Sequence, residues 1–101
     1  MKTNPIMALV TTVEDLGSVR VVSTVRNGAR VIILSGKLPG PDGYYRAVRI
    51  DDNGGGFLRV LFIRSGEVRS LNMHWLDLLG NFATMPDIIP ILWEYLKQSN
   101  G

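Results

Sequence analysis

The 101-residue chain has the length of one compact domain, and its size leaves little room for a second. Hydrophobic residues make up 46% of the chain and charged residues 20%, a balance that argues against intrinsic disorder. The chain has no cysteine, which excludes disulfides, thiolate metal sites and cysteine nucleophiles. Its apolar runs are too short for a membrane helix or a signal peptide. We therefore expect a single cytoplasmic domain over residues 1–101 that does not bind a membrane.

The first third of the chain predicts three β-strands. Residues 7–13 are rich in β-formers and are followed by Glu14–Gly17, which is typical of a turn. The valine-rich segment Ser18–Arg26 predicts the second strand. Asn27–Gly28 is the strongest two-residue hairpin signal, because both residues tolerate positive φ. Arg30–Ser35 is then expected to return as the antiparallel partner.

The middle of the chain predicts a loop and three more strands. Residues 36–43 contain three glycines and two prolines, which is typical of a surface loop that carries function. The next strands are expected at Tyr44–Ile50, Phe57–Arg64 and Glu67–Leu71, with turns at 51–56 and Ser65–Gly66. The fold class predicted is α+β, mainly β: a strongly bent antiparallel six-strand meander, or a small barrel, packed by one C-terminal helix.

The last third of the chain changes to helical spacing. Asn72 is expected to cap a short helix over Met73–Leu79 that stops at Gly80. The C-terminal helical segment is expected over 84–98, with Asp87 as the cap of a helix from Ile88 to Gln98. Pro90 falls in the first turn of that helix, where a missing N–H costs nothing.

The final helix carries an unusually broad apolar surface. Five hydrophobic residues recur at helical spacing and form one stripe: Ile88, Ile91, Leu92, Tyr95 and Leu96. Ile89 and Trp93 widen this stripe beyond what one docking face needs. Either the helix is deeply buried within one domain, or a second subunit contacts it. The second explanation makes Ile89, Trp93 and Leu96 candidate interface residues of a homo-oligomer, in the simplest case a dimer.

Residues 28–79 contain the strand Gly28–Ile33, the aromatic-led strand Tyr44–Val48, the strand Val60–Ile63, and a short strand that ends in a helical turn. This order of features resembles a Tudor-like small β-barrel. It implies a barrel-like core over 28–79. The chain departs from the family where methyl-reading members have an Asp-Tyr pair, because Arg64 and Ser65 stand there. Half of the aromatic cage is therefore missing, and we do not expect binding of methylated side chains.

A second barrel type accommodates the rest of the chain. A barrel of six or seven strands closed by a C-terminal helix, like the pleckstrin-homology type, uses the first strands and places Trp93 on the closing helix. Against this type, Glu14–Asp15 stands in the first loop, where a phosphoinositide site needs lysines. In any barrel version, four aromatic residues are candidates for lining a small-molecule pocket: Tyr44, Tyr45, Phe62 and Trp75.

The basic residues are concentrated in the predicted strands. The net charge is only +2, but all eight arginines lie between Arg20 and Arg69. The candidate contacts to phosphates or other anions are Arg46, Arg49, Arg59 and Arg64. Tyr44 or Tyr45 would then stack on an unpaired base. Alternatively, these arginines lie over apolar neighbours with their charges in water, or form ion pairs inside an interface.

No catalytic motif is present. The spacings of a phosphate-binding loop, a calcium loop and a hydrolase nucleophile elbow all fail. His74 is the only histidine; it is either a general base paired with Asp77 or a hydrogen-bonded structural residue, and we favour the second. We expect no catalytic residues, metal or cofactor. The first hypothesis is a non-enzymatic binding or adaptor domain that self-associates, followed by a nucleic-acid-binding domain and a small-molecule-binding protein.

Overall fold

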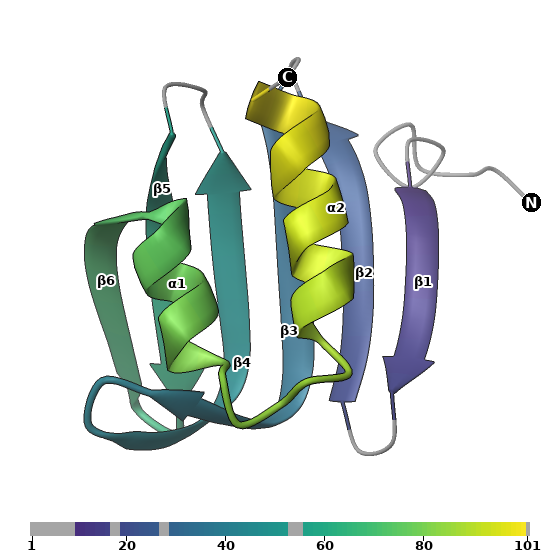
Figure 1. The fold of residues 1–101 in the computed structure, drawn as a ribbon. Coiled ribbons are helices and arrows are strands. Elements are labelled where there is room, and N and C mark those ends of the chain that lie inside the picture. Colours follow the sequence, from purple (N-terminus) through teal and green to yellow (C-terminus); the bar gives the residue numbers. More distant parts are fainter. Residues whose placement is uncertain (1–9, 17–18, 27–28, 53–55, 101) are drawn as a thin grey trace, which may run out of the picture.

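The computed structural model describes residues 10–16, 19–26, 29–52 and 56–100, but not the side chains of 10–16, Arg26 and 95–100. The described residues form one antiparallel sheet and two helices (Figure 1). The strands are β1 (Val10–Leu16), β2 (Val19–Arg26), β3 (Ala29–Gly40), β4 (Gly43–Asp52), β5 (Phe57–Arg64) and β6 (Glu67–His74). The helices are α1 (Trp75–Asn81) and α2 (Ile89–Asn100).

The sheet is an open meander. Within the described part of the chain its six strands follow the order β1-β2-β3-β4-β5-β6, so β1 and β6 are its two edges and do not pair with each other. The predicted mainly-β antiparallel meander with a C-terminal helix is confirmed. The described strands do not close into a barrel, and two helices rather than one pack on the sheet. The helices cover the face that barrel closure would have enclosed, so the core is completed without joining the edges (Figure 1).

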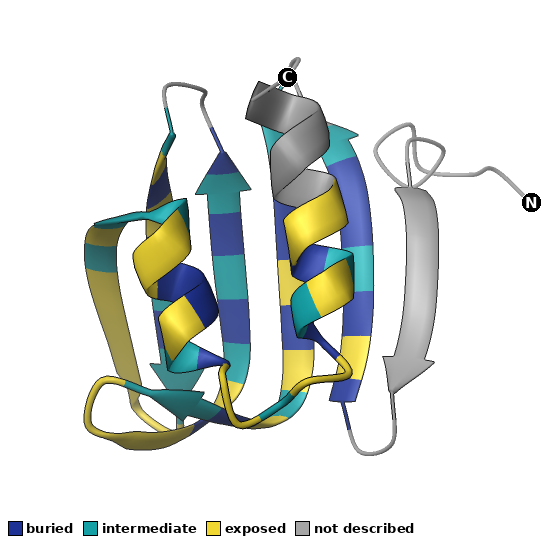
Figure 2. Ribbon diagram, viewed as in Figure 1, coloured by how far each residue is buried: buried dark blue, intermediate teal, exposed yellow. Residues whose placement is uncertain are grey.

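Strand alternation places the core between the sheet and the helices. Neighbouring strands pair Val21 with Leu34, Leu34 with Val48, and Val48 with Phe62, and all four side chains are fully buried. Figure 2 shows the resulting change between buried and more exposed residues along each central strand. The helical segment contributes five buried residues to the same core: Leu78, Leu79, Phe82, Ile88 and Leu92. Because β2 and α2 both contribute, the core extends beyond the barrel-like segment 28–79.

The predicted loop at 36–43 is wrong, because most of it is β-hairpin. β3 continues through Gly40, β4 begins at Gly43, and only Pro41–Asp42 form the turn. The register shifts between Ser35 and Leu38, where Gly36 has a φ of 142° that disfavours any other residue. This bulge bends the end of the hairpin. Glycine and proline suggested a loop, but the buried pair Leu38–Tyr45 keeps the segment in the sheet.

Several element boundaries also differ from the prediction. β1 extends through Glu14–Leu16, which had been expected to form a turn. β6 continues to His74, so His74 rather than Asn72 precedes α1, and Gly80 lies inside that helix. The helix predicted within 84–98 begins at Ile89, with Pro90 in its first turn as expected. The predicted turn at Asn27–Gly28 lies outside the described residues. Neither described helix combines the length and hydrophobicity needed to span a membrane.

Candidate functional site

The face of the sheet opposite the helices, which we call the open face, carries both hydrophobic and charged residues. The strand register aligns Val22, Ile33, Arg49, Leu61 and Ser70 in one row across five strands. The next row contains Arg20, Ser35, Ala47, Ile63 and Val68. Val31 and Thr24 on this face are buried, but Ile33 is 36% exposed and Val68 61% exposed. The open face is therefore partly apolar along much of its surface.

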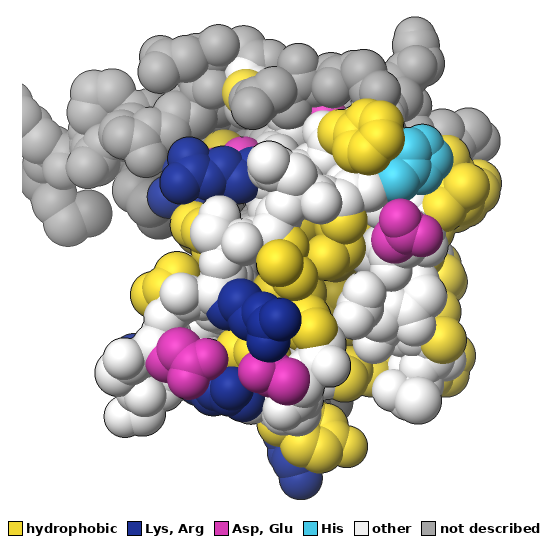
Figure 3. Space-filling view, turned by 90° about the vertical axis from the view of Figure 1, so that its left-hand side faces the viewer, with side chains coloured by type: hydrophobic (Ala, Val, Ile, Leu, Met, Phe, Trp, Pro, Cys, Tyr) yellow, Lys and Arg dark blue, Asp and Glu magenta, His cyan; other side chains and the backbone are white. Residues whose placement is uncertain are grey.

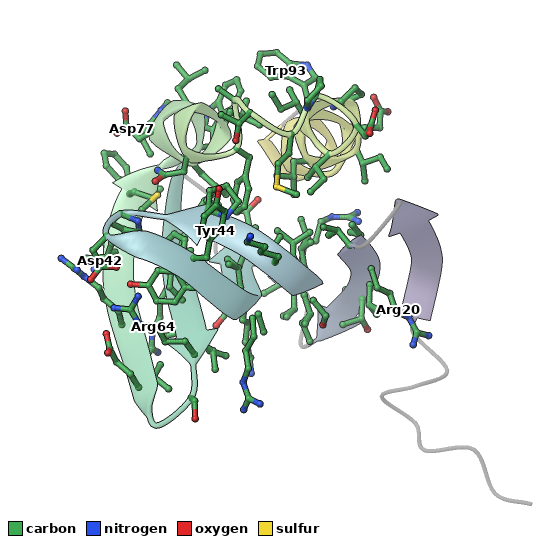
Figure 4. The ribbon with its side chains drawn as sticks, turned by 90° about the horizontal axis from the view of Figure 1, so that it is seen from below. Arg20, Asp42, Tyr44, Arg64, Asp77 and Trp93 are labelled. Carbon is green, nitrogen blue, oxygen red and sulfur yellow. The ribbon has the colours of Figure 1, made fainter. Side chains whose placement is uncertain are left out.

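The four candidate arginines do not converge on one site. On the open face, Arg49 donates through Nε to Oδ1 of Asp51 at 2.8 Å. Arg59 lies opposite Asp51 on the same face and is exposed. Arg46 is exposed beside the β3 bulge, and Arg64 lies at the end of β5 against the bent hairpin. Figure 4 places Arg64 beside Asp42 and far across the sheet from Arg20.

The turn of the β3–β4 hairpin is held to the β5–β6 hairpin by a cluster around Asp42, which we call the Asp42 clasp. Oδ2 of Asp42 accepts hydrogen bonds from Nη2 of Arg64 at 3.1 Å and from Nη1 of Arg69 at 2.8 Å. Oδ1 accepts a hydrogen bond from the hydroxyl of Tyr45. The guanidinium of Arg64 lies 4.4 Å from the centre of the Tyr45 ring and also contacts Glu67. Donors from three strands, β4, β5 and β6, thus converge on one carboxylate.

The hydrogen bonds and charges in this clasp favour ionised Asp42, neutral Tyr45 and protonated Arg64. The Tyr45 hydrogen bond, followed by the charges of Arg64 and Arg69, holds the pKa of Asp42 below its ordinary value. The same hydrogen bond raises the pKa of Tyr45, because its neutral form is the donor. The hydrogen bond to Glu67, with the charge of Asp42, raises the pKa of Arg64. Asp42 and Glu67 therefore neutralise the charge of Arg64, so Arg64 is less suited to bind an external phosphate.

A row of aromatic side chains lies at the end of β6 away from the Asp42 clasp, where α1 begins. The ring centres of Phe57 and His74 are 5.4 Å apart, those of His74 and Trp75 are 5.7 Å apart, and those of Trp75 and Trp93 are 4.6 Å apart. Phe57 is 63% exposed and Trp93 41% exposed, and Leu76 next to the row is also exposed. The row thus joins β5, β6, α1 and α2 into one accessible apolar surface.

His74 has a structural role in this row. Its Nδ1 accepts a hydrogen bond from the backbone N–H of Leu76 at 3.3 Å, so the imidazole caps α1. The nitrogen that a general base needs is therefore occupied in this arrangement. Among the described residues, no group of three or more His, Asp or Glu side chains is placed to hold a metal ion.

The four pocket candidates divide between two ends of the molecule. The rings of Tyr45 and Phe62 touch, with centres 5.2 Å apart, and both side chains are buried. Tyr44 is exposed at the hairpin, where Lys37 lies 4.6 Å from its ring centre. Trp75 follows His74, whose strand partner is Phe57, five residues along β5 from Phe62. At the rise of an extended strand this is about 17 Å, so these residues do not line one pocket.

The three interface candidates on α2 have different environments. Ile89 is half-buried and packs against the core. Trp93 is exposed and contacts Trp75 at the surface (Figure 4). The side chain of Leu96 lies outside the described residues. Of this set, Trp93 alone has a described side chain that is available to a partner.

Sequence reasoning missed the residues that form the Asp42 clasp and the exposed hydrophobic residues of the sheet. Asp42 was interpreted only as part of a turn, and Arg69 lies 27 positions away from it. Phe57 and Val68 were assigned to strands without a role. The alternation around Val60 and Phe62 could have placed Phe57 on the opposite face, whereas no local signal pairs Asp42 with Arg69.

Comparison with known proteins finds no matching family model, curated protein or solved structure. The Tudor-like resemblance of residues 28–79 therefore stays a prediction.

Proposed function

We propose that this chain is a non-enzymatic protein-interaction domain that self-associates. The observation that carries the proposal is the exposure of Ile33, Phe57 and Val68, which all lie on the open face or its β6 border. The half-buried Leu61 and Ile63 lie between the strands of Ile33 and Val68, and apolar surface shared by several strands marks interaction sites in folded proteins. The arginines and Asp51 on the same face suit the polar part of such an interface.

The chemistry of the remaining polar residues supports binding rather than catalysis. The imidazole of His74 is engaged in capping α1, and the carboxylate of Asp42 is engaged by three donors. A general acid or base needs a free proton-transfer atom within reach of a substrate. These groups instead hold the chain's own elements together.

Sedimentation equilibrium from about 1 to 100 μM tests self-association, because the affinities of specific protein pairs commonly fall in or below this range. We expect the mass to rise from that of the 11.2 kDa chain toward that of a dimer. A monomeric mass at every concentration would contradict the proposal.

A second function, binding of single-stranded nucleic acid, is favoured by the neighbours on β5. Phe57 and Arg59 are both exposed and share the open face, so a ring lies next to a guanidinium that has no ion pair with another described residue. This combination suits base stacking with phosphate contact. Titration of labelled oligonucleotides tests it: affinity must fall with added salt, and Arg59→Gln must weaken it.

A further inference from the structure

The two edges of the sheet differ in how they are protected. The β1–β2 pairing has a register shift between Val10 and Thr12, and a bulge of this kind interrupts an edge. The β5–β6 pairing is regular over eight residue pairs, from Arg64–Glu67 to Phe57–His74. β6 contains neither proline nor lysine, which are common edge protections, and no described element lies beyond it (Figure 1). β6 is thus a long, regular edge open to another strand.

The backbone of β6 presents alternate residues to that edge. Trp75 donates its N–H to the carbonyl of Gly56 on the β5 side, so the odd-numbered residues of β6 bond toward β5. The same alternation follows from the two-residue turn Ser65–Gly66, which closes on the pair Arg64–Glu67. The outward N–H and C=O groups therefore belong to the even-numbered residues: Val68, Ser70, Asn72 and His74.

From these features we infer that β6 pairs antiparallel with β6 of a second copy, with Leu71 on the two-fold axis, so that two sheets join into one. The inference rests on the self-association proposed above and names its interface. In a two-fold antiparallel pair, opposite residues lie on the same face of the sheet. One residue therefore lies directly opposite its own copy, and the axis runs between the two copies. With Leu71 there, Ser70 faces Asn72 of the second copy, and Val68 faces its His74.

Charge and the number of backbone hydrogen bonds select this register over its neighbours. An axis at Arg69 places two arginines directly opposite each other, which is destabilising. An axis at Ser70 brings the two copies of Arg69 to diagonal positions and sets Glu67 against Met73. An axis at Leu71 separates the two arginines by about 13 Å along the strands, places Leu71 opposite its own copy and Ser70 opposite Asn72, and sets Arg69 against Met73. It also forms hydrogen bonds from all four outward-facing residues.

The ends of the β6 side are complementary in the same orientation. Figure 3 looks at this side and shows basic and acidic side chains toward its lower end, the histidine, a carboxylate and hydrophobic side chains at the upper right, and further basic side chains at the upper left. The first end holds the Asp42 clasp with Arg69, which is 43% exposed. The second end holds His74, Trp75 and exposed Asp77. A two-fold axis at Leu71 brings each end next to its opposite, so Arg69 of one copy approaches Asp77 of the other.

The first experiment is Ser70→Pro, studied by sedimentation equilibrium. The N–H of Ser70 points away from β5, so proline there leaves the intrachain ladder intact while it removes two hydrogen bonds across the symmetric dimer. We expect the dimer dissociation constant to rise at least about tenfold. A thermal melt followed by circular dichroism checks that the variant folds. The matched control is Ser70→Ala, which removes the hydroxyl but keeps the backbone N–H, and it is expected to leave the dimer dissociation constant close to that of the wild type.

The second experiment tests the register and uses the absence of cysteine from the chain. Leu71→Cys is expected to form an intermolecular disulfide under mild oxidation, because a non-hydrogen-bonded pair brings the Cα atoms to about 4.5 Å. Ser70→Cys is expected not to crosslink, because the two copies of residue 70 lie about 8–9 Å apart in this register.

Each outcome bears on a definite claim. A monomeric wild type overturns the proposed function and, with it, this interface. A dimeric wild type that Ser70→Pro leaves unchanged, without crosslinking by Leu71→Cys, overturns the β6 interface alone. Equal weakening of the dimer by Ser70→Ala and Ser70→Pro would place the contact on the Ser70 side chain instead of the strand edge. Crosslinking through Ser70→Cys rather than Leu71→Cys overturns the register.

Discussion

The two faces of the sheet differ in what covers them more than in how hydrophobic their residues are. On the helix-covered face, Leu34, Val48 and Phe62 have no exposed surface. On the open face, Ile33 lies next to Leu34 in the chain and is 36% exposed. An exposed isoleucine on its own is ordinary, but Ile33 belongs to a surface that continues through Leu61 and Ile63 to Val68. The covered face accounts for folding, and the open face remains available for binding.

The largest expected effect compares the faces at adjacent residues. Leu34→Ala deletes a fully buried side chain and is expected to lower the free energy of unfolding by about 2–5 kcal/mol. Ile33→Ala is expected to lower it by less than about 1 kcal/mol. Urea denaturation of both variants, at a concentration where the wild type is monomeric, measures the difference. Equal losses would mean that the open face is covered in solution within a single chain.

The next effect concerns the bent hairpin that closes one end of the covered face. A Cβ at Gly40 would lie 2.5 Å from Cε2 of Tyr45 and 3.1 Å from Cδ1 of Phe62. We expect Gly40→Ala to destabilise the fold by about 1–3 kcal/mol, because these rings pack in the core.

Gly80→Ala is the matched control for that substitution. Its Cβ meets no atom within 4 Å, and the residue lies inside α1. Alanine is expected to stabilise the fold by about 0.5–1 kcal/mol there. If Gly40→Ala were equally favourable in thermal melts, the hairpin would not be packed against Phe62.

The smallest expected effect is on the pH dependence of stability. The pKa of Asp42 is lowered in the folded state, so its carboxylate contributes stability above about pH 4, which is lost as the pH falls through the lowered pKa. The pKa of Tyr45 is raised, so its contribution is lost as the pH rises above about 10. Asp42→Asn is expected to lower stability at neutral pH and to flatten the loss in acid.

Denaturation at about pH 3, 5 and 7 measures this change in slope. Asp87→Asn is the control, because Asp87 is exposed and has no hydrogen bond or ion pair to another described residue. A steep acid loss that persists in Asp42→Asn would show that other carboxylates control it.

Some of the candidate site was accessible from the sequence. Alternation along Phe57–Arg64 separates Leu58, Val60 and Phe62 from Arg59 and Leu61, as found. The arginines were recognised, but their partners were not. Arg64 depends on Asp42, which lies 22 residues earlier, and only the bend at Gly36 brings the two together. Likewise, the contact between Trp75 and Trp93 joins two helices whose relative placement depends on the shared core.

Local chemistry by itself determined the alternating strands, the Ser65–Gly66 turn and the helical C-terminal third, because each follows from the backbone preferences and spacing of neighbouring residues. Only the tertiary structure decided that the sheet stays open, that the glycine-rich segment joins it as a bent hairpin, and which face the helices cover. These outcomes depend on burying Leu38, Tyr45 and Leu92 together with residues remote in the chain. Long-range packing of this kind leaves no periodic trace in the sequence, and it also decides which hydrophobic surface remains exposed.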